Sequence, residues 1–224
     1  MAEPEPSSPR RSDSVFTRPP RGRRSQPALT RDRIVAGTIA LLDREGSAAL
    51  TMRRVAAELG VHATSLYWYV ARREDLVDLA VDGILAEAAA GLPGPEEPWD
   101  LAVRTTARRF YAALTAHAWA AEFAGVRPLL GPNALALSRR IVAALGDSGG
   151  GEEAQAVAIR ALANQILGAA TTTVAMRVGA AAGGGTEDAR AAAVSAADAL
   201  AVENAYFDQV IDLLLAGIRA RSAG

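Results

Sequence analysis

The chain has 224 residues and a formal net charge of −1; half of its residues are hydrophobic and none is cysteine. This length suits one large domain, or a small domain joined to a larger one. The lack of cysteine excludes a disulfide framework, a thiolate zinc site and a redox thiol. No apolar run reaches the roughly 18 residues of a membrane span, so we expect a cytoplasmic protein that does not enter a membrane.

The charge is unevenly distributed along the chain. Residues 1–85 contain 13 arginines and 11 acidic residues, the rest contains 11 arginines and 14 acidic residues, and lysine is absent. This basic excess is too small to indicate nucleic-acid binding by itself. Residues 1–28 are rich in proline and arginine and hold few apolar residues, so we predict a disordered N-terminal arm. Its arginines could lie along a phosphate backbone, or the arm could be a solvated tail without a specific role.

Signals for four helices follow the arm. Thr30 and Thr51 are good N-caps, and Gly46 and Gly60 end the helices that those residues begin. We predict helices over residues 31–45, 52–59, 64–70 and 73–90. Two short helices joined by a turn with glycine are typical of a helix-turn-helix. The pattern therefore predicts a helix-turn-helix domain over residues 29–75.

An aromatic cluster stands at the end of this unit, where Tyr67, Trp68 and Tyr69 follow one another. At about 100° per residue, Leu66 and Val70 share the core-facing side of the third helix, and Trp68 lies opposite them. Packing within the unit explains an outward indole poorly, although Trp68 could pack on a neighbouring domain. Hydroxyl groups that could donate to phosphates or base edges are carried by Thr64, Ser65, Tyr67 and Tyr69.

Two arginines, Arg72 and Arg73, open the fourth helix. The N-terminus of a helix is the unfavourable end for a cation, because the helix dipole places partial positive charge there. A nearby polyanion would explain why both are tolerated.

These residues resemble a known family. The stretch LTMRRVAAELGVHATSLYWYVARREDLVDLAV is similar to the DNA-binding domain of the tetracycline-repressor (TetR) family, and the match extends over residues 30–85. The later stretches HAWAAEFAGVRPLLGPNALAL, IRALANQILGAATTTVAMR and FDQVIDLLLAGIRAR resemble the regulatory domain of the tetracycline repressors themselves. The resemblance implies an all-α protein, with the helix-turn-helix domain followed by a helical bundle for ligand binding and dimerisation over residues 76–224.

The resemblance also implies contacts with double-stranded DNA. The matching positions are Thr51 for a phosphate, Arg53 for a base, Ala63, Thr64 and Ser65 for bases, Tyr67 and Tyr69 for backbone and groove, and Arg73 for a phosphate clamp. We add Trp68 to this set because of its outward position. The chain carries His62, Ala63 and Thr64 where the tetracycline repressors carry Glu, Gln and Pro, so the operator sequence is left open.

The regulatory part is predicted to be helical throughout. We expect helices from Pro98 to His117, around 119–123, from Pro132 to Leu145, from Glu152 to about Ala182, from about Asp188, and from about Val202 to Arg221. The last helix carries an apolar stripe formed by Phe207, Ile211, Leu214, Leu215 and Ile218. Such a stripe suits either the core of one chain or a self-complementary interface. The resemblance implies a homodimer with a four-helix interface.

The ligand pocket is expected to differ from that of the tetracycline repressors. In those proteins a His and a Thr near an Arg-Pro pair hold the magnesium-chelated drug. The stretch FAGVRP places Phe123 and Val126 at the two positions, and neither side chain binds magnesium. We therefore expect no metal, no cofactor and a largely apolar ligand. The polar groups of the pocket would be His117, Asn133, Asn164, Gln165, Thr172 and Arg177.

Other roles are open for three of these residues. A lone His117 is more often structural than a ligand contact. Asn164 and Gln165 could instead form hydrogen bonds between helices at the dimer interface.

No catalytic motif accompanies these signals. The two histidines lie in different domains, and the sequence contains no nucleophile elbow, phosphate-binding loop or His-Glu-x-x-His motif. We therefore do not expect an enzyme. The chain is predicted to be a ligand-responsive transcriptional regulator, a repressor released from a palindromic operator by a small apolar inducer. The alternative is a small-molecule-binding or scaffold protein whose helix-turn-helix no longer binds DNA, and a helical-bundle enzyme ranks far below both.

Overall fold

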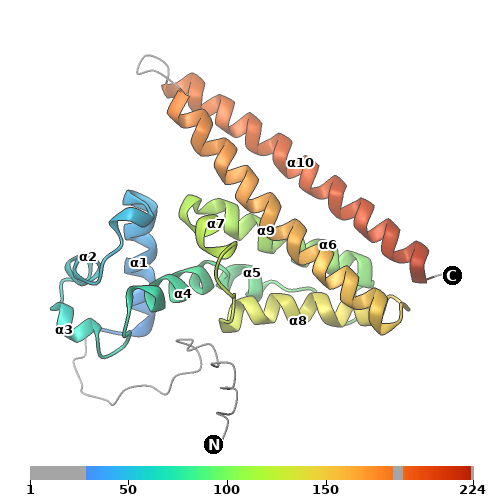
Figure 1. Ribbon diagram of the computed structural model, residues 1–224, viewed down its shortest axis with the longest axis horizontal. Coiled ribbons are helices and arrows are strands. Elements are labelled where there is room, and N and C mark those ends of the chain that lie inside the picture. The colour runs from blue at the N-terminus through green and yellow to red at the C-terminus, as the bar shows by residue number, and fades with distance from the viewer. Residues whose placement is uncertain (1–28, 184–188, 223–224) are drawn as a thin grey trace, which may run out of the picture.

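The computed structural model describes residues 29–183 and 189–222, with side chains described outside 180–197. In this part of the chain every regular element is a helix, as the all-α prediction requires. The predicted N-terminal arm, residues 1–28, lies outside the described residues. Figure 1 shows α2 and α3 at one end of the molecule and the long helices α9 and α10 side by side across it.

The N-terminal unit has the predicted order of helices. Its elements are α1 (Arg31–Glu45), the 3₁₀ turn η1 (Ser47–Ala49), α2 (Met52–Glu58), α3 (Ala63–Leu66) and α4 (Arg73–Ile84). The Oγ1 atoms of Thr30 and Thr51 accept hydrogen bonds of 3.2 Å from backbone N–H groups in the first turns of α1 and α2. Both predicted N-caps are confirmed.

The third helix is shorter than predicted. It ends at Leu66, because the backbone N–H of Tyr69 bonds to the Leu66 carbonyl three residues earlier and tightens the chain into a turn. The predicted burial of Leu66 and Val70 is confirmed, with 0% and 1% of their surfaces exposed. Helix α1 crosses α4 closely, since a Cβ atom at Gly83 would overlap Val35.

The regulatory part follows the predicted outline with one correction. Its helices are α5 (Ala86–Ala90), α6 (Trp99–Ala116), α7 (Ala118–Ala124), α8 (Pro132–Gly146), α9 (Glu152–Gly183) and α10 (Ala189–Ser222). The prediction of two helices after residue 188 is wrong, because α10 is continuous. Between Ala189 and Ala216 the sequence is rich in alanine and contains neither glycine nor proline, so nothing in it interrupts a helix.

The apolar stripe of the last helix belongs to the chain's own core. Phe207, Ile211 and Leu215 are buried, and the Phe207 ring stacks on Tyr111 of α6 with 4.1 Å between ring centroids. The Tyr111 hydroxyl lies 2.9 Å from Thr173 Oγ1 on α9, and burial raises the pKa of Tyr111. Contacts between these three aromatic and hydroxyl side chains therefore join α6, α9 and α10.

The predicted helix from Arg73 to Ala90 is two helices, so that prediction is wrong at Leu85. The Leu85 N–H bonds to the Asp82 carbonyl three residues earlier, and the same carbonyl accepts a 3.0 Å hydrogen bond from Asn133 Nδ2. Because this carbonyl accepts from the residue three positions later and from Asn133, the regular α-helical hydrogen-bond pattern is interrupted, and the chain turns between α4 and α5.

Asp82 also supplies the side-chain acceptor that caps the N-terminus of α8. The residue before Pro132 is Gly131, which has no side chain to cap the helix, and a Cβ atom there would overlap the Asp82 carboxyl group. Asp82 Oδ1 accepts hydrogen bonds of 3.0 Å from the backbone N–H groups of Asn133 and Ala134. A side chain of α4 therefore accepts the hydrogen bonds of two backbone N–H groups in the first turn of α8.

Burial raises the pKa of Asp82 above its ordinary value, although the N–H groups of Ala134 and Asn133 oppose that shift. The folded protein thus binds this proton more tightly than the unfolded chain does. At neutral pH the buried charge of Asp82 consequently lowers the stability of the folded state, whereas the hydrogen bonds that Asp82 accepts raise that stability.

We expect Asp82→Ala to lower the free energy of unfolding at pH 7 by about 1–3 kcal/mol, because buried donors in α8 lose their acceptor. Asp82→Asn should cost less, since its Oδ1 keeps the two backbone hydrogen bonds without a buried charge. Urea denaturation followed by circular dichroism measures both.

The comparison of the wild type with Asp82→Asn should depend on pH. As the pH falls from about 7 through the raised pKa towards the unfolded value near 3.9, the wild type loses its buried charge and gains stability relative to the variant. A difference that stays constant over this range would contradict the direction assigned to the pKa.

Candidate DNA-contact surface and ligand crevice

The aromatic cluster lies on the outer surface of the helix-turn-helix. Trp68 is 56% exposed, and Tyr67 and Tyr69 are also exposed. They follow α3 at the end of the molecule farthest from the C-terminus of α10 (Figure 1). The alternative that Trp68 packs on the neighbouring domain is therefore wrong.

Arg53 is one of two exposed arginines on α2. Its guanidinium makes no hydrogen bond or ion pair with the described part of the chain. The next residue, Arg54, pairs with Glu45, and Arg44 pairs with Glu58 at 2.7 Å. These ion pairs fix α2 against α1 and leave the Arg53 side chain at the surface.

The predicted base-facing residues occupy the first turn of α3. Thr64 is exposed, and Ala63 and Ser65 are half-buried. The N-cap residue His62 is exposed and forms no side-chain capping bond. Small side chains and an uncapped helix start leave this turn open to close approach by another surface.

Two of the predicted DNA contacts are engaged within the chain. The Tyr69 hydroxyl donates a 2.6 Å hydrogen bond to the Leu29 carbonyl. The Arg73 guanidinium donates to the carbonyls of Ser47 and Leu50, each at 2.9 Å. Carbonyl groups of the protein thus explain the cation of Arg73 at the start of α4, and a nearby polyanion is not needed to account for it.

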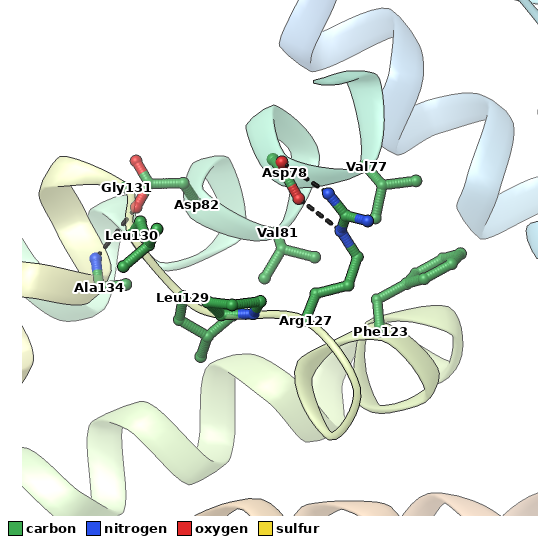
Figure 2. Close-up of a pocket in the computed structure, with 11 residues that line it drawn as sticks. Val77, Asp78, Val81, Asp82, Phe123, Arg127, Leu129, Leu130, Gly131 and Ala134 are labelled. Atoms are coloured by element: carbon green, nitrogen blue, oxygen red, sulfur yellow. Dashed lines mark hydrogen bonds and ion pairs between the residues drawn. The ribbon is translucent and has the colours of Figure 1, made fainter. Parts of the chain in front are cut away.

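A crevice lies between α4 and the loop that joins α7 to α8 (Figure 2). Its walls are formed by Val77, Asp78, Val81, Asp82, Phe123, Arg127, Pro128, Leu129, Leu130, Gly131 and Ala134. Its cavity volume is about 10 Å³, which holds roughly one water molecule. A drug-sized ligand needs about 300 Å³ or more, so the crevice is closed in this state.

An ion pair closes the crevice at one end. Arg127 Nε and Nη2 donate to the two carboxylate oxygens of Asp78 at 2.6 and 2.8 Å, as Figure 2 shows. Hydrogen bonding with Asp78 raises the pKa of Arg127. Asp78 lies one helical turn before Asp82 on α4, so one face of α4 holds both ends of the α7–α8 loop.

The structure does not bring the eight predicted ligand contacts together around this crevice. Phe123 lines it, whereas Val126 is 78% exposed and points away from the core. Asn133 donates to Asp82 at the edge of the crevice, Arg177 donates to the Thr115 carbonyl at 2.7 Å, and His117 lies beside Asp43. On α9, Asn164 and Thr172 are exposed and Gln165 is half-buried. Their role in ligand binding stays a prediction.

His117 takes part in a junction that sequence reasoning missed. Asp43 Oδ1, on α1, lies 2.7 Å from His117 Nδ1 and accepts a 2.6 Å hydrogen bond from Trp119 Nε1. This carboxylate joins the helix-turn-helix unit to α7. The carboxylates of α4 were also missed, although two acidic residues four positions apart within the apolar run VDLAVDGIL were a usable signal.

Two absences concern the described residues, 29–183 and 189–222. Within them, no three His, Cys, Asp or Glu side chains gather as metal ligands. None of the helices described there has both the length and the apolar character needed to cross a bilayer.

Family models and known proteins match the chain. The model described as "Tetracyclin repressor-like, C-terminal domain" matches residues 92–222, and that of "Bacterial regulatory proteins, tetR family" matches residues 34–80. An HTH-type transcriptional regulator of Saccharopolyspora erythraea is 40% identical over 156 residues, which is 69% of this chain and 65% of the relative. The HTH-type transcriptional repressor DrrR1 of Streptomyces coeruleorubidus is 38% identical over 118 residues, 53% of this chain and 43% of the relative. The chain thus spans less than two thirds of the length of these curated relatives.

A solved structure shows the same fold over most of the chain. The TetR family protein ActR of Streptomyces coelicolor, in complex with actinorhodin, matches with a TM-score of 0.69 and 28% identity, covering 87% of this chain and 97% of ActR. The C-terminal family model alone matches more than half of the chain, and the N-terminal model matches the helix-turn-helix. The chain therefore belongs to the TetR family of bacterial transcriptional regulators.

Proposed function

We propose that this protein is a cytoplasmic, ligand-responsive transcriptional repressor without catalytic activity. It binds a palindromic operator through the helix-turn-helix, and a small apolar molecule releases it. The observation that carries the proposal is the outward surface formed by Arg53, Tyr67 and Trp68: all three are exposed, and the Arg53 guanidinium has no hydrogen bond or ion pair with the described part of the chain. The relative DrrR1 is named a transcriptional repressor, and the ActR structure contains actinorhodin.

The DNA contacts that we propose come from two short elements. Arg53 projects from the first turn of α2, and a guanidinium that has no partner among the described residues is suited to reading guanine. Thr64 on α3 and Tyr67 directly after it are exposed, and their hydroxyls can donate to phosphates or base edges. Thr51 caps α2 with its oxygen and keeps its hydroxyl hydrogen for a phosphate.

We expect Arg53→Ala to weaken operator binding by about 1–3 kcal/mol and to relax the preference at one base pair. Arg54→Ala is the matched control, because that exposed neighbouring arginine is already paired with Glu45. Fluorescence anisotropy with single-base operator variants measures both effects. Equal losses for the two variants, without a change in base preference, would rule out the assignment of Arg53.

The homodimer is proposed to form through the outer faces of α9 and α10. At about 100° per residue, Val202, Tyr206 and Leu213 lie within about 40° of one another on α10, opposite its buried stripe. All three are exposed, Leu213 by 72%. Such an apolar face on a long helix suits a two-fold interface.

Replacing Tyr206 and Leu213 together by glutamate should convert the dimer to monomers, because two charges would be buried at the interface. Both side chains are exposed in the single chain, so its fold should be retained. Light scattering measures the oligomeric state, and Val142→Glu, at an exposed position on α8, is the control. A double variant that remains dimeric would place the interface elsewhere.

The ligand is proposed to act through α4. This helix begins beside the helix-turn-helix and is held to the α7–α8 loop by Asp78 and Asp82. Because the crevice between them is closed, a ligand that enters it must move α4 away from the loop. A ligand that prefers this opened state shifts the population away from the state that binds DNA.

We expect a small, largely apolar molecule to release the operator equally well with and without EDTA, and actinorhodin, which is bound in the ActR structure, is a further compound to test. Operator DNA should weaken ligand binding by the same factor, with a coupling of about 1–3 kcal/mol. Titration of the labelled operator complex measures release, with tetracycline and magnesium as the comparison. Release that requires magnesium would contradict the proposed pocket, since Phe123 and Val126 offer the metal no ligand atom.

A further inference from the structure

One side chain ties the start of α4 to the start of α2. Arg73 is the first residue of α4, and its Nε and Nη2 atoms donate to the carbonyls of Leu50 and Ser47, each at 2.9 Å. These carbonyls stand at the two ends of the link that contains η1. Leu50 directly precedes Thr51, the N-cap of α2, so the guanidinium holds the backbone from which α2 begins.

Apart from the Leu50 side chain, which is buried in the core, the link held by Arg73 depends on its own backbone hydrogen bonds. Its backbone bonds from Ala49 to Gly46 and from Leu50 to Ser47 are 3.3 and 3.2 Å long, and η1 has no side-chain cap. A planar guanidinium presents parallel N–H groups in a fixed fork, which one ammonium group cannot reproduce. The geometry of the pair of carbonyls therefore requires arginine at this position.

We propose that Arg73 is a positioning residue for operator recognition: it fixes α2 against α4, and thereby sets where Arg53 meets the base pairs, and it does not neutralise a phosphate. This inference rests on the proposed DNA-binding function. It departs from the phosphate clamp that the family resemblance implies. It also makes Arg73 the point at which a displacement of α4 reaches α2.

The two roles of Arg73 differ in their salt dependence. Loss of a phosphate contact lowers the slope of log affinity against log salt by about 0.9 and weakens all sequences alike. Loss of a positioning contact leaves that slope unchanged and relaxes the base preference that Arg53 provides. The effects of Arg53 and Arg73 should then be strongly non-additive, because both act on one contact.

The experiment uses the full chain and a duplex recovered from random-sequence DNA by selection with the wild-type protein. Binding is measured by anisotropy over a series of potassium chloride concentrations. We expect Arg73→Ala to weaken binding at least about tenfold, as the loss of two hydrogen bonds implies, with the wild-type salt slope. Arg73→Lys should bind as weakly as Arg73→Ala, and adding Arg73→Ala to Arg53→Ala should reduce affinity little further.

Two controls complete the experiment. Arg139→Ala removes one exposed charge from α8 and should change neither affinity nor slope. If Arg73→Ala loses its helical circular dichroism, Arg73→Gln provides the same comparison while retaining one donor. A salt slope reduced by about one unit, with affinity restored by Arg73→Lys, would show a phosphate contact and overturn the inference. A wild-type protein that selects no duplex would overturn the proposed function, and this inference with it.

Discussion

Asp82 joins α4 to the start of α8, because its carboxylate accepts three hydrogen bonds from Asn133 and Ala134. Its oxygen completes the first turn of α8, and its backbone carbonyl, shared with Asn133, ends α4. One residue thus fixes both the length of α4 and the position of α8. Because buried polar groups must be satisfied, α4 cannot shift relative to α8 without leaving N–H groups unpaired. This constraint explains why the crevice beside Asp82 is closed and why opening it carries a free-energy cost.

The helix-turn-helix could be predicted closely because its signals are local. Thr30 and Thr51 cap the helices that they precede, and the spacing of Leu66 and Val70 places Trp68 outside. The break at Leu85 could not be predicted in this way. It depends on Asn133, which lies 51 residues from Asp82 in sequence, and nothing near Leu85 reports that contact. The continuity of α10 could have been predicted from its composition, since it lacks a helix breaker before Gly217.

The surroundings of the candidate ligand contacts were harder to predict than those of the candidate DNA contacts, for a physical reason. A residue such as Arg53 is recognised because it has no partner in the described part of the chain, and local periodicity shows that it faces outward. Three of the polar residues assigned to the ligand, His117, Asn133 and Arg177, do have partners, and these come from distant parts of the chain. His117 and Arg177 were assigned to a pocket because they are polar in an apolar region, yet Asp43 and the Thr115 carbonyl occupy them. Sequence reasoning can find such groups but cannot separate a ligand contact from a tertiary hydrogen bond.

The junction at Asp43 gives the molecule a built-in optical reporter. The indole of Trp119 is 2% exposed and donates to Asp43 across the boundary between α1 and α7, whereas the indole of Trp68 is open to solvent. Indole emission shifts with the polarity around the ring, so the two tryptophans report on different events. A water-soluble quencher would reduce the emission of Trp68, and this quenching would become weaker when the surface around Trp68 is covered. Emission from Trp119 would move to longer wavelength only when the two domains separate. With the third, half-buried tryptophan, Trp99, replaced by phenylalanine, fluorescence can therefore follow coverage of the proposed DNA-contact surface at Trp68 and movement between domains at Trp119.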